Sequence, residues 1–204
     1  REICADLPGL IAQADEMDIV AKHIKGVVLA NEDLSDCSFK ACVFENCRLT
    51  DCRFLNTGFT DVEFISCDFS GSDFSQGYFC RCRISSCKGV GVNMLDACLK
   101  QLSLHDSNFM YINLGKTTMK NCAVSESDLS CARFCACTQA QVTLSKVRLT
   151  GASFFTTPLK DLDFSDSQID GLIVSESGQE LKGAVVSPYQ ASELAKLLGV
   201  RIKD

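Results

Sequence analysis

The chain has 204 residues, with 26 acidic and 20 basic side chains, a formal net charge of −6 and 46% hydrophobic residues. This length allows one domain, or two at most, with enough chain for a hydrophobic core, and the composition excludes a disordered chain. The negative charge argues against binding to nucleic acid or to an anionic membrane surface. No run approaches the roughly 18 apolar residues of a membrane span. We therefore expect a soluble protein, and the reduced cysteines described below imply that it is cytoplasmic.

Residues 1–26 are predicted to form an N-terminal cap. Apolar residues from Leu7 to Val20 follow a roughly helical spacing, and Asp6 with Pro8 is typical of the start of a helix. We expect a short helix or an irregular cap here, which passes into the next region near Lys25.

A period of five residues dominates residues 27–176. In steps of five from Leu34 to Val174, 27 of the 29 positions hold a large apolar residue, and only Gly89 and Gln139 do not. Twelve of the 13 phenylalanines fall in this phase, with Phe155 as the exception. Neither an α-helix nor a β-strand has this period, so it indicates an internal repeat.

Two residues before each large residue, a small one recurs, and nine of the 14 cysteines occupy this position. Their spacing does not match the paired ligands of a zinc site, and the chain has only two histidines, so we expect no metal. With a coil of twenty residues, Cys47, Cys67 and Cys87 stack in one inward column, where parallel side chains disfavour disulfides. They are interpreted as reduced, small apolar fillers. Outward positions are predicted for four further thiols open to oxidants, namely Cys80, Cys98, Cys131 and Cys135.

A five-residue unit places one large and one small side chain inward and three outward, so it cannot bury its large residue alone. Stability must come from stacking many units into a solenoid. At the two exceptions, Gly89 is predicted to mark a bulge or bend, and Gln139 is predicted to find a backbone hydrogen-bond partner.

Residues 177–204 are expected to form a loop, a helix and a short strand. Ser187, Pro188 and Gln190 together predict a capping box with proline at the first helical position, and Gly199 predicts the helix end. A strand is expected from Val200 to Ile202. The helix would cover the open end of the solenoid, and its remaining apolar surface would meet a second copy. The predicted dimer interface consists of Tyr189, Leu194, Leu197, Leu198, Val200 and Ile202.

Units such as Gly71-Ser72-Asp73-Phe74 and Glu126-Ser127-Asp128-Leu129 resemble those of the pentapeptide-repeat family. This resemblance implies an all-β, right-handed quadrilateral β-helix with four units per coil, hence about seven coils. The helix, glycine and apolar segment after the last coil resemble the ending of a bacterial subgroup, which includes the Qnr quinolone-resistance, albicidin-resistance and microcin B17 self-protection proteins. That resemblance implies end-to-end dimers and a B-DNA-like acidic rod that binds DNA gyrase or topoisomerase IV. Unlike plasmid-type Qnr proteins, this chain keeps its phase without a protruding loop.

Sorting outward residues by face gives an acidic face beside a basic one. The basic face holds Lys40, Arg81, Lys100, Lys120 and Lys160. The acidic face, the candidate site for a partner, holds Glu45, Glu63, Asp106, Glu126, Asp163 and Asp166, together with Arg83 and Lys146. A merely soluble rod would also carry such stripes.

The sequence contains no recognisable arrangement of nucleophile, base and orienting residue, and no cofactor motif. We therefore predict a protein that is not an enzyme and has no cofactor. The leading hypothesis is a DNA mimic that binds a topoisomerase and protects it from quinolone-like or peptide poisons. The alternative is a rigid protein-interaction scaffold without a topoisomerase target, and a redox or small-molecule-binding protein is a third class.

Overall fold

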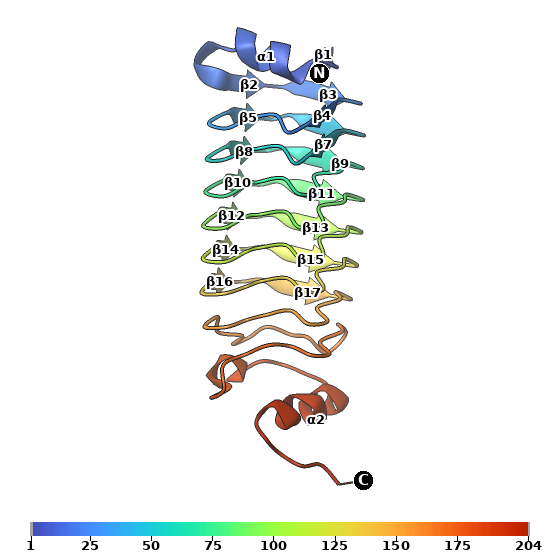
Figure 1. The fold of residues 1–204 in the computed structure, drawn as a ribbon, viewed down its shortest axis with the longest axis vertical. Coiled ribbons are helices and arrows are strands. Elements are labelled where there is room, and N and C mark those ends of the chain that lie inside the picture. The colour runs from blue at the N-terminus through green and yellow to red at the C-terminus, as the bar shows by residue number, and fades with distance from the viewer. Residues whose placement is uncertain (1, 204) are drawn as a thin grey trace.

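The computed structural model describes residues 2–203. The protein forms a parallel β-solenoid with a helix near each end (Figure 1). The confirmed fold has about seven coils. Each strand pairs in parallel with the strand one coil away, in a register of twenty residues, such as Phe39 with Phe59 and Phe79 with Leu99. Because five is a quarter of this register, the sequence period becomes four flat faces around one core.

The strands on these faces form two long sheets and one short sheet. The eight-stranded sheet consists of β1 (Glu2–Cys4), β3 (Lys22–Lys25), β6 (Val43–Glu45), β9 (Glu63–Ile65), β11 (Arg83–Ser85), β13 (Ser103–His105), β15 (Ala123–Ser125) and β17 (Thr143–Ser145). The seven-stranded sheet consists of β2 (Asp18–Val20), β5 (Ser38–Lys40), β8 (Gly58–Thr60), β10 (Tyr78–Cys80), β12 (Cys98–Lys100), β14 (Thr118–Lys120) and β16 (Thr138–Ala140). The short sheet pairs β4 (Val28–Ala30) with β7 (Arg48–Thr50). Isolated parallel bridges every twenty residues complete the other faces, as between Asp33 and Arg53.

The corners between faces rely on left-handed backbone. One residue in nearly every pentad has a positive φ, and this position is rich in asparagine, aspartate and glycine, as at Asn46, Asp61 and Gly71. These residue types tolerate the left-handed region best. Asparagine, aspartate and glycine at the corner position are therefore a second sequence signal of the repeat, beside the apolar period.

The solenoid begins earlier than expected from the sequence. Helix α1 (Leu7–Gln13) is capped by Asp6, whose carboxylate accepts the N–H of Gly9 at 3.0 Å. A 3-10 turn (Asp15–Met17) follows, and β2 and β3 already pair with β5 and β6 of the next coil. Ile19 and Ile24 lie in the five-residue phase and are buried. The cap proper is thus shorter than the expected residues 1–26.

At the other end, part of the expected loop stacks on the last full coil and extends its edge. A 3-10 turn (Gln179–Leu181) and the segment after it hydrogen-bond to the last full coil, with the N–H of Phe164 donating to the carbonyl of Val185 at 2.8 Å. Asp163 bridges Val185, two residues beyond the usual register of twenty. The turn around Gly178 takes up these extra residues, so the coil pattern continues although its sequence phase is lost.

Helix α2 (Pro188–Leu197) confirms the predicted capping box between Ser187 and Gln190, and Gly199 ends it with a φ of 77°. The predicted strand over Val200–Ile202 is wrong, because residues 200–203 form neither a strand nor a helix. A strand needs a neighbouring edge to pair with, and the described chain brings none to this segment. Within residues 2–203, no helix is long and apolar enough to cross a membrane.

The prediction of a bulge at Gly89 is also wrong, since the chain keeps its register there. The ring of Phe109, one coil away, occupies the space where a side chain would be. A Cβ atom on Gly89 would lie 2.3 Å from this ring. Gly89 and Phe109 thus share one inward position across two coils.

Candidate interaction groove

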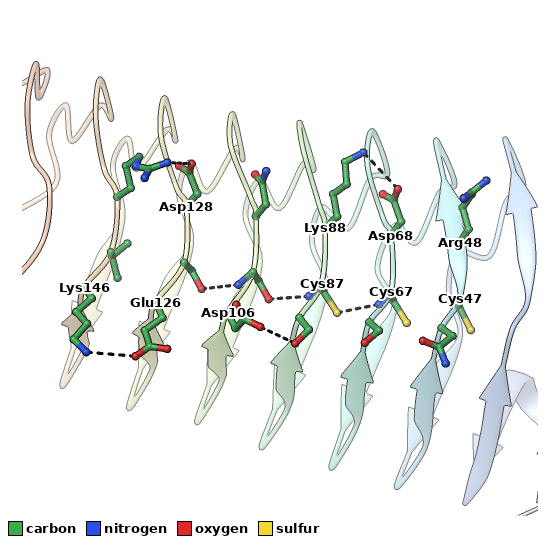
Figure 2. A pocket seen from close by; sticks show the side chains of 18 of the residues that line it. Cys47, Arg48, Cys67, Asp68, Cys87, Lys88, Asp106, Glu126, Asp128 and Lys146 are labelled. Carbon is green, nitrogen blue, oxygen red and sulfur yellow. Dashed lines mark hydrogen bonds and ion pairs between the residues drawn. The ribbon is translucent and has the colours of Figure 1, made fainter.

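A long groove of about 1030 Å³ runs along one corner of the rod, beside the eight-stranded sheet (Figure 2). We call it the corner groove. It consists of three parallel rows whose members lie one coil apart. The floor runs from Cys47 to Val147, one wall from Asn46 to Asp166, and the other wall from Arg48 to Gln168. Six coil steps of about 4.8 Å give the groove a length of about 29 Å.

The floor is the inward column of small residues, as predicted for Cys47, Cys67 and Cys87. Side chains on the floor satisfy the backbone of the coil before them. The N–H of Cys67 donates to the Cys87 sulfur at 3.3 Å, and the N–H of Cys87 donates to the Ser107 hydroxyl at 3.0 Å. A hydrogen bond to Cys47 raises the pKa of the Cys67 thiol, and burial raises it further. These thiols act as rigid small fillers and hydrogen-bond partners.

The walls carry charges of both signs, many of them paired between adjacent coils. Lys146 lies 3.5 Å from Glu126, and Arg148 lies 2.9 Å from Asp128. Asp106 and Asp166 instead accept hydroxyl hydrogen bonds, from Ser86 and Ser145 respectively. The corner groove therefore carries local negative charge at Asp106 and Asp166, three coils apart.

Two models of known protein families match the repeat region of this chain. The model for pentapeptide repeats in eight copies matches residues 37–76, and the model for a pentapeptide repeat region matches residues 57–134. The chain belongs to the pentapeptide-repeat family. No curated protein matches it.

Among solved structures, this pentapeptide-repeat protein is similar to trypsin-treated QnrB1, which is a plasmid-mediated fluoroquinolone resistance protein. The identity is 20%, with 92% of each chain covered and a TM-score of 0.47. HetL, a pentapeptide-repeat protein involved in heterocyst differentiation regulation in the cyanobacterium Nostoc, shares 13% identity over 83% of this chain and 87% of its own, with a TM-score of 0.34. A pentapeptide-repeat protein of the Arabidopsis thaliana thylakoid lumen shares 20% identity over 64% of this chain and 75% of its own, with a TM-score of 0.30. These likenesses concern the fold alone.

The structure divides the predicted acidic face of this pentapeptide-repeat protein into separate rows. Asp106, Glu126 and Asp166 lie together on one wall of the corner groove. Glu45 lies in β6, where Lys25 at 2.8 Å and His23 at 2.7 Å hold the pKa of its carboxyl below the usual value. Glu63 stands in β9, far along the rod from Asp163. The six carboxylates therefore do not form one continuous stripe.

The predicted basic face is partly neutralised as well. Lys40 pairs with Asp18 at 2.7 Å, and Arg81 pairs with Asp61 at 2.6 Å. Lys100 lies over the ring of Tyr78, with its Nζ 5.3 Å from the ring centre. Pairs between coils use exposed charges to bridge neighbouring strands, and each contributes little to stability.

The four thiols predicted to face outward differ in their surroundings. Cys98, Cys131 and Cys135 are half-buried, whereas Cys80 is buried, which corrects the prediction of an accessible thiol there. The guanidinium of Arg81, whose Nη1 lies 3.3 Å from the Cys80 sulfur, helps to cover it. Within residues 2–203, no cluster of three or more histidine, cysteine or acidic side chains has the arrangement of a metal site.

Most of the predicted dimer residues lie on the open surface of the C-terminal segment. Tyr189 is 68% exposed, and Leu198 and Val200 are each 52% exposed. Leu197 and Ile202 are exposed as well. Leu194 is different, because it is half-buried and packs against the core. Its role in the fold is to hold α2 on the end of the solenoid.

The sequence sorting by face missed the corner groove. The row of Asn46 and the row of Arg48 lie on either side of the corner, and both flank the inward column that begins at Cys47. The groove could have been predicted from the twenty-residue register, because this register aligns both rows along the rod.

Proposed function

We propose that this pentapeptide-repeat protein is a non-catalytic scaffold that binds a partner protein along the corner groove. The observation that carries this proposal is the groove itself, a continuous recess of about 1030 Å³ along the rod with charged walls in a fixed spacing. A solenoid holds such side chains rigidly, so little ordering entropy opposes binding. Asp106 and Asp166 favour a partner with basic side chains about three coils apart, a distance of about 14 Å.

A paired charge-neutralising substitution tests this site. Asp106→Asn with Asp166→Asn removes both negative charges and keeps oxygen acceptors. The matched control is Asp36→Asn with Asp96→Asn, also three coils apart but on another corner. In affinity capture from the native cytosol, we expect proteins retained by the wild type and the control to be lost from the groove variant. An unchanged set of retained proteins in the groove variant would contradict the proposal.

The second candidate function is the binding of DNA gyrase or topoisomerase IV as a DNA mimic. One observation favours it, since Asp106, Glu126 and Asp166 stand in a single row at multiples of the coil spacing. B-DNA, however, carries a charge about every 1.7 Å, which is nearly three per coil. The row offers at most one carboxylate per coil, and Glu126 is paired with Lys146. The general scaffold is therefore the better-supported function.

A gyrase supercoiling assay with a fluoroquinolone separates the two candidates. If the protein is a topoisomerase-binding mimic, it protects or inhibits the enzyme, and the Asp106→Asn, Asp166→Asn variant does so less. If purified gyrase keeps the same activity and drug sensitivity over a large molar excess of the protein, the mimic hypothesis is refuted and the general scaffold remains.

We also propose that a second copy binds at the C-terminal segment. Leu197, Leu198, Val200 and Ile202 follow one another closely at the end of the rod, and each is between 44% and 52% exposed. Contiguous exposed apolar groups favour association, and residues 200–203 form neither a helix nor a strand. A homodimer would cover these side chains and double the length of the rod.

A further inference from the structure

The N-terminal half of the solenoid is filled by stacked phenylalanine rings. Phe39 and Phe59 stack with ring centres 5.4 Å apart, and Phe59 and Phe79 with centres 4.8 Å apart. On another face, Phe54 and Phe74 stack at 4.5 Å. Each of these rings is at most 4% exposed, so this part of the core is tightly packed.

The central coils have the same backbone but smaller inward residues. After Phe79 the large positions hold mainly leucine, isoleucine, methionine and valine, and the coil from Leu114 to Leu129 contains no phenylalanine. The parallel ladder fixes the cross-section of the solenoid, so smaller side chains leave space at its centre. The structure contains a cavity of about 70 Å³ there, lined by residues that include Leu104, Leu114, Met119, Val124, Leu144 and Leu149.

Three lining residues show that this space is not closed by packing. Met119, Val124 and Leu144 point inward like Phe39 and Phe59, yet they are only half-buried, whereas both rings are completely buried. The lining side chains are apolar except for Cys122, Gln139 and Thr157, and these three expose no polar surface to the cavity. An apolar cavity of this kind stays dry and takes up small apolar molecules, as shown by an engineered cavity of about 150 Å³ that binds benzene or xenon.

The wall of the solenoid is interrupted next to this cavity. In earlier coils, the N–H of Thr118 donates to Ala97 and that of Thr138 donates to Thr117, each at 3.0 Å. The next residue in this column is Pro158, which has no N–H to donate. The seven-stranded sheet accordingly ends at β16.

Gln139 occupies the interruption. Its side-chain Nε2 donates to the carbonyl of Lys160 at 3.1 Å, which confirms the predicted backbone partner. In earlier coils a backbone N–H fills this place, as when Asn121 donates to Ala140 at 3.0 Å. One side-chain hydrogen bond thus replaces part of the backbone ladder, and a side chain rotates more easily than a strand separates.

A surface recess lies outside this point. It measures about 630 Å³ and is lined by residues 137–142 together with Pro158, Lys160 and Asp161. Gln139 and Val142 line both the recess and the interior cavity. Gln139 therefore separates the solvent-filled recess from the apolar interior.

We propose that the central cavity is a binding site for one small apolar molecule, which enters between β16 and the Pro158–Asp161 segment when the Gln139 side chain moves aside. The cavity has about half the volume of the benzene-binding example, so the ligand class is uncharged, without strong hydrogen-bonding groups, and smaller than benzene. Xenon belongs to this class and serves as the probe. The site is independent of the corner groove, because it lies inside the rod.

Xenon titration of the full chain, followed by methyl NMR, tests this site. We expect saturable shifts of the methyl groups of Met119, Val124 and Leu144, and none for Leu34 in the phenylalanine-filled end. Val124→Phe fills the cavity and should reduce these shifts at least tenfold. Shifts that are absent in the wild type, or unchanged in folded Val124→Phe, would overturn the site.

One control variant separates the loss of xenon binding from a folding defect, and one further variant tests the entrance. Leu49→Phe makes the same kind of enlargement at a completely buried position outside the cavity. It should lower the Tm by overpacking, whereas Val124→Phe should leave the Tm unchanged or raise it. For the entrance, Gln139→Ala should raise the xenon exchange rate at least threefold with little change in affinity. An unchanged exchange rate would refute the gate.

Discussion

At the scale of single residues, the corners of the solenoid combine a demanding backbone with varied side chains. Thr156 has a φ of 59°, in the left-handed region that β-branched residues avoid. Thr156→Gly relieves this strain while keeping the N–H that Glu180 accepts at 3.0 Å. We expect a gain of roughly 0.5–1 kcal/mol in the free energy of unfolding, measured with urea.

The matched control is Thr60→Gly in β8, where the backbone is ordinary strand. Glycine there should lower the free energy of unfolding by roughly 0.5–1 kcal/mol. If both variants lose stability to the same extent, the left-handed corner is not a source of strain.

Glu180 is a buried carboxylate, only 4% exposed, that is held by hydrogen bonds. Its oxygens accept the N–H of Thr156 at 3.0 Å and the hydroxyl of Ser175 at 2.7 Å. Burial acts to raise the pKa of Glu180, but these hydrogen bonds outweigh it and leave the pKa below its usual value of 4.5. The stabilisation is therefore complete above pH 4.5 and is lost as the pH falls through the folded pKa.

Glu180→Gln places an amide N–H₂ against donors, so we expect a loss of about 1–3 kcal/mol at pH 7. Because the variant has no charge to lose, its deficit relative to wild type should shrink in acid. Urea unfolding at pH 7 and pH 3 measures both effects, with Glu176→Gln on the exposed neighbouring turn as control. A deficit that stays constant over this range would contradict a carboxylate held in its charged form.

At the scale of elements, each coil position depends on the residue twenty places away. Gly89 and Phe109 illustrate this, because the ring fills the space beside the glycine. Gly89→Ala should cost about 1–3 kcal/mol through overpacking. In a Phe109→Leu background the same change should cost much less. Thermal unfolding of the four proteins of this cycle measures the coupling, and strictly additive losses would show that the ring is not the cause.

The five-residue period predicted most of this architecture because it reports the coil directly. The large residues from Leu34 to Ile169 point inward, and Cys47, Cys67 and Cys87 form a column as expected. The same register places Phe109 beside Gly89, a pairing that reading along the chain overlooked. The strand expected at Val200–Ile202 failed for a different reason, since pairing depends on a neighbouring edge and not on apolar residues alone.

At the scale of the whole molecule, the two ends solve the problem of open sheet edges differently. Helix α1 and β1 cover the first coil, whereas α2 covers the last one (Figure 1). Gln190 ties α2 down by donating to the carbonyls of Phe164 and Ser167, both at 2.8 Å. At the end of this anchored helix and beyond it, the apolar residues Leu197, Leu198, Val200 and Ile202 stay exposed.

The proposed dimer can be tested by placing a charge on this exposed segment. Leu198 is 52% exposed, so Leu198→Asp costs little in an isolated chain but buries an unpaired charge in a dimer. We expect the wild type to sediment as a dimer and Leu198→Asp as a monomer, with nearly the same Tm at low protein concentration. Leu194→Asp should instead lower the Tm itself, because Leu194 packs against the core. Tyr111→Asp, at a side chain 56% exposed in the middle of the rod, should remain dimeric. Identical sedimentation of the wild type and Leu198→Asp would refute the C-terminal interface.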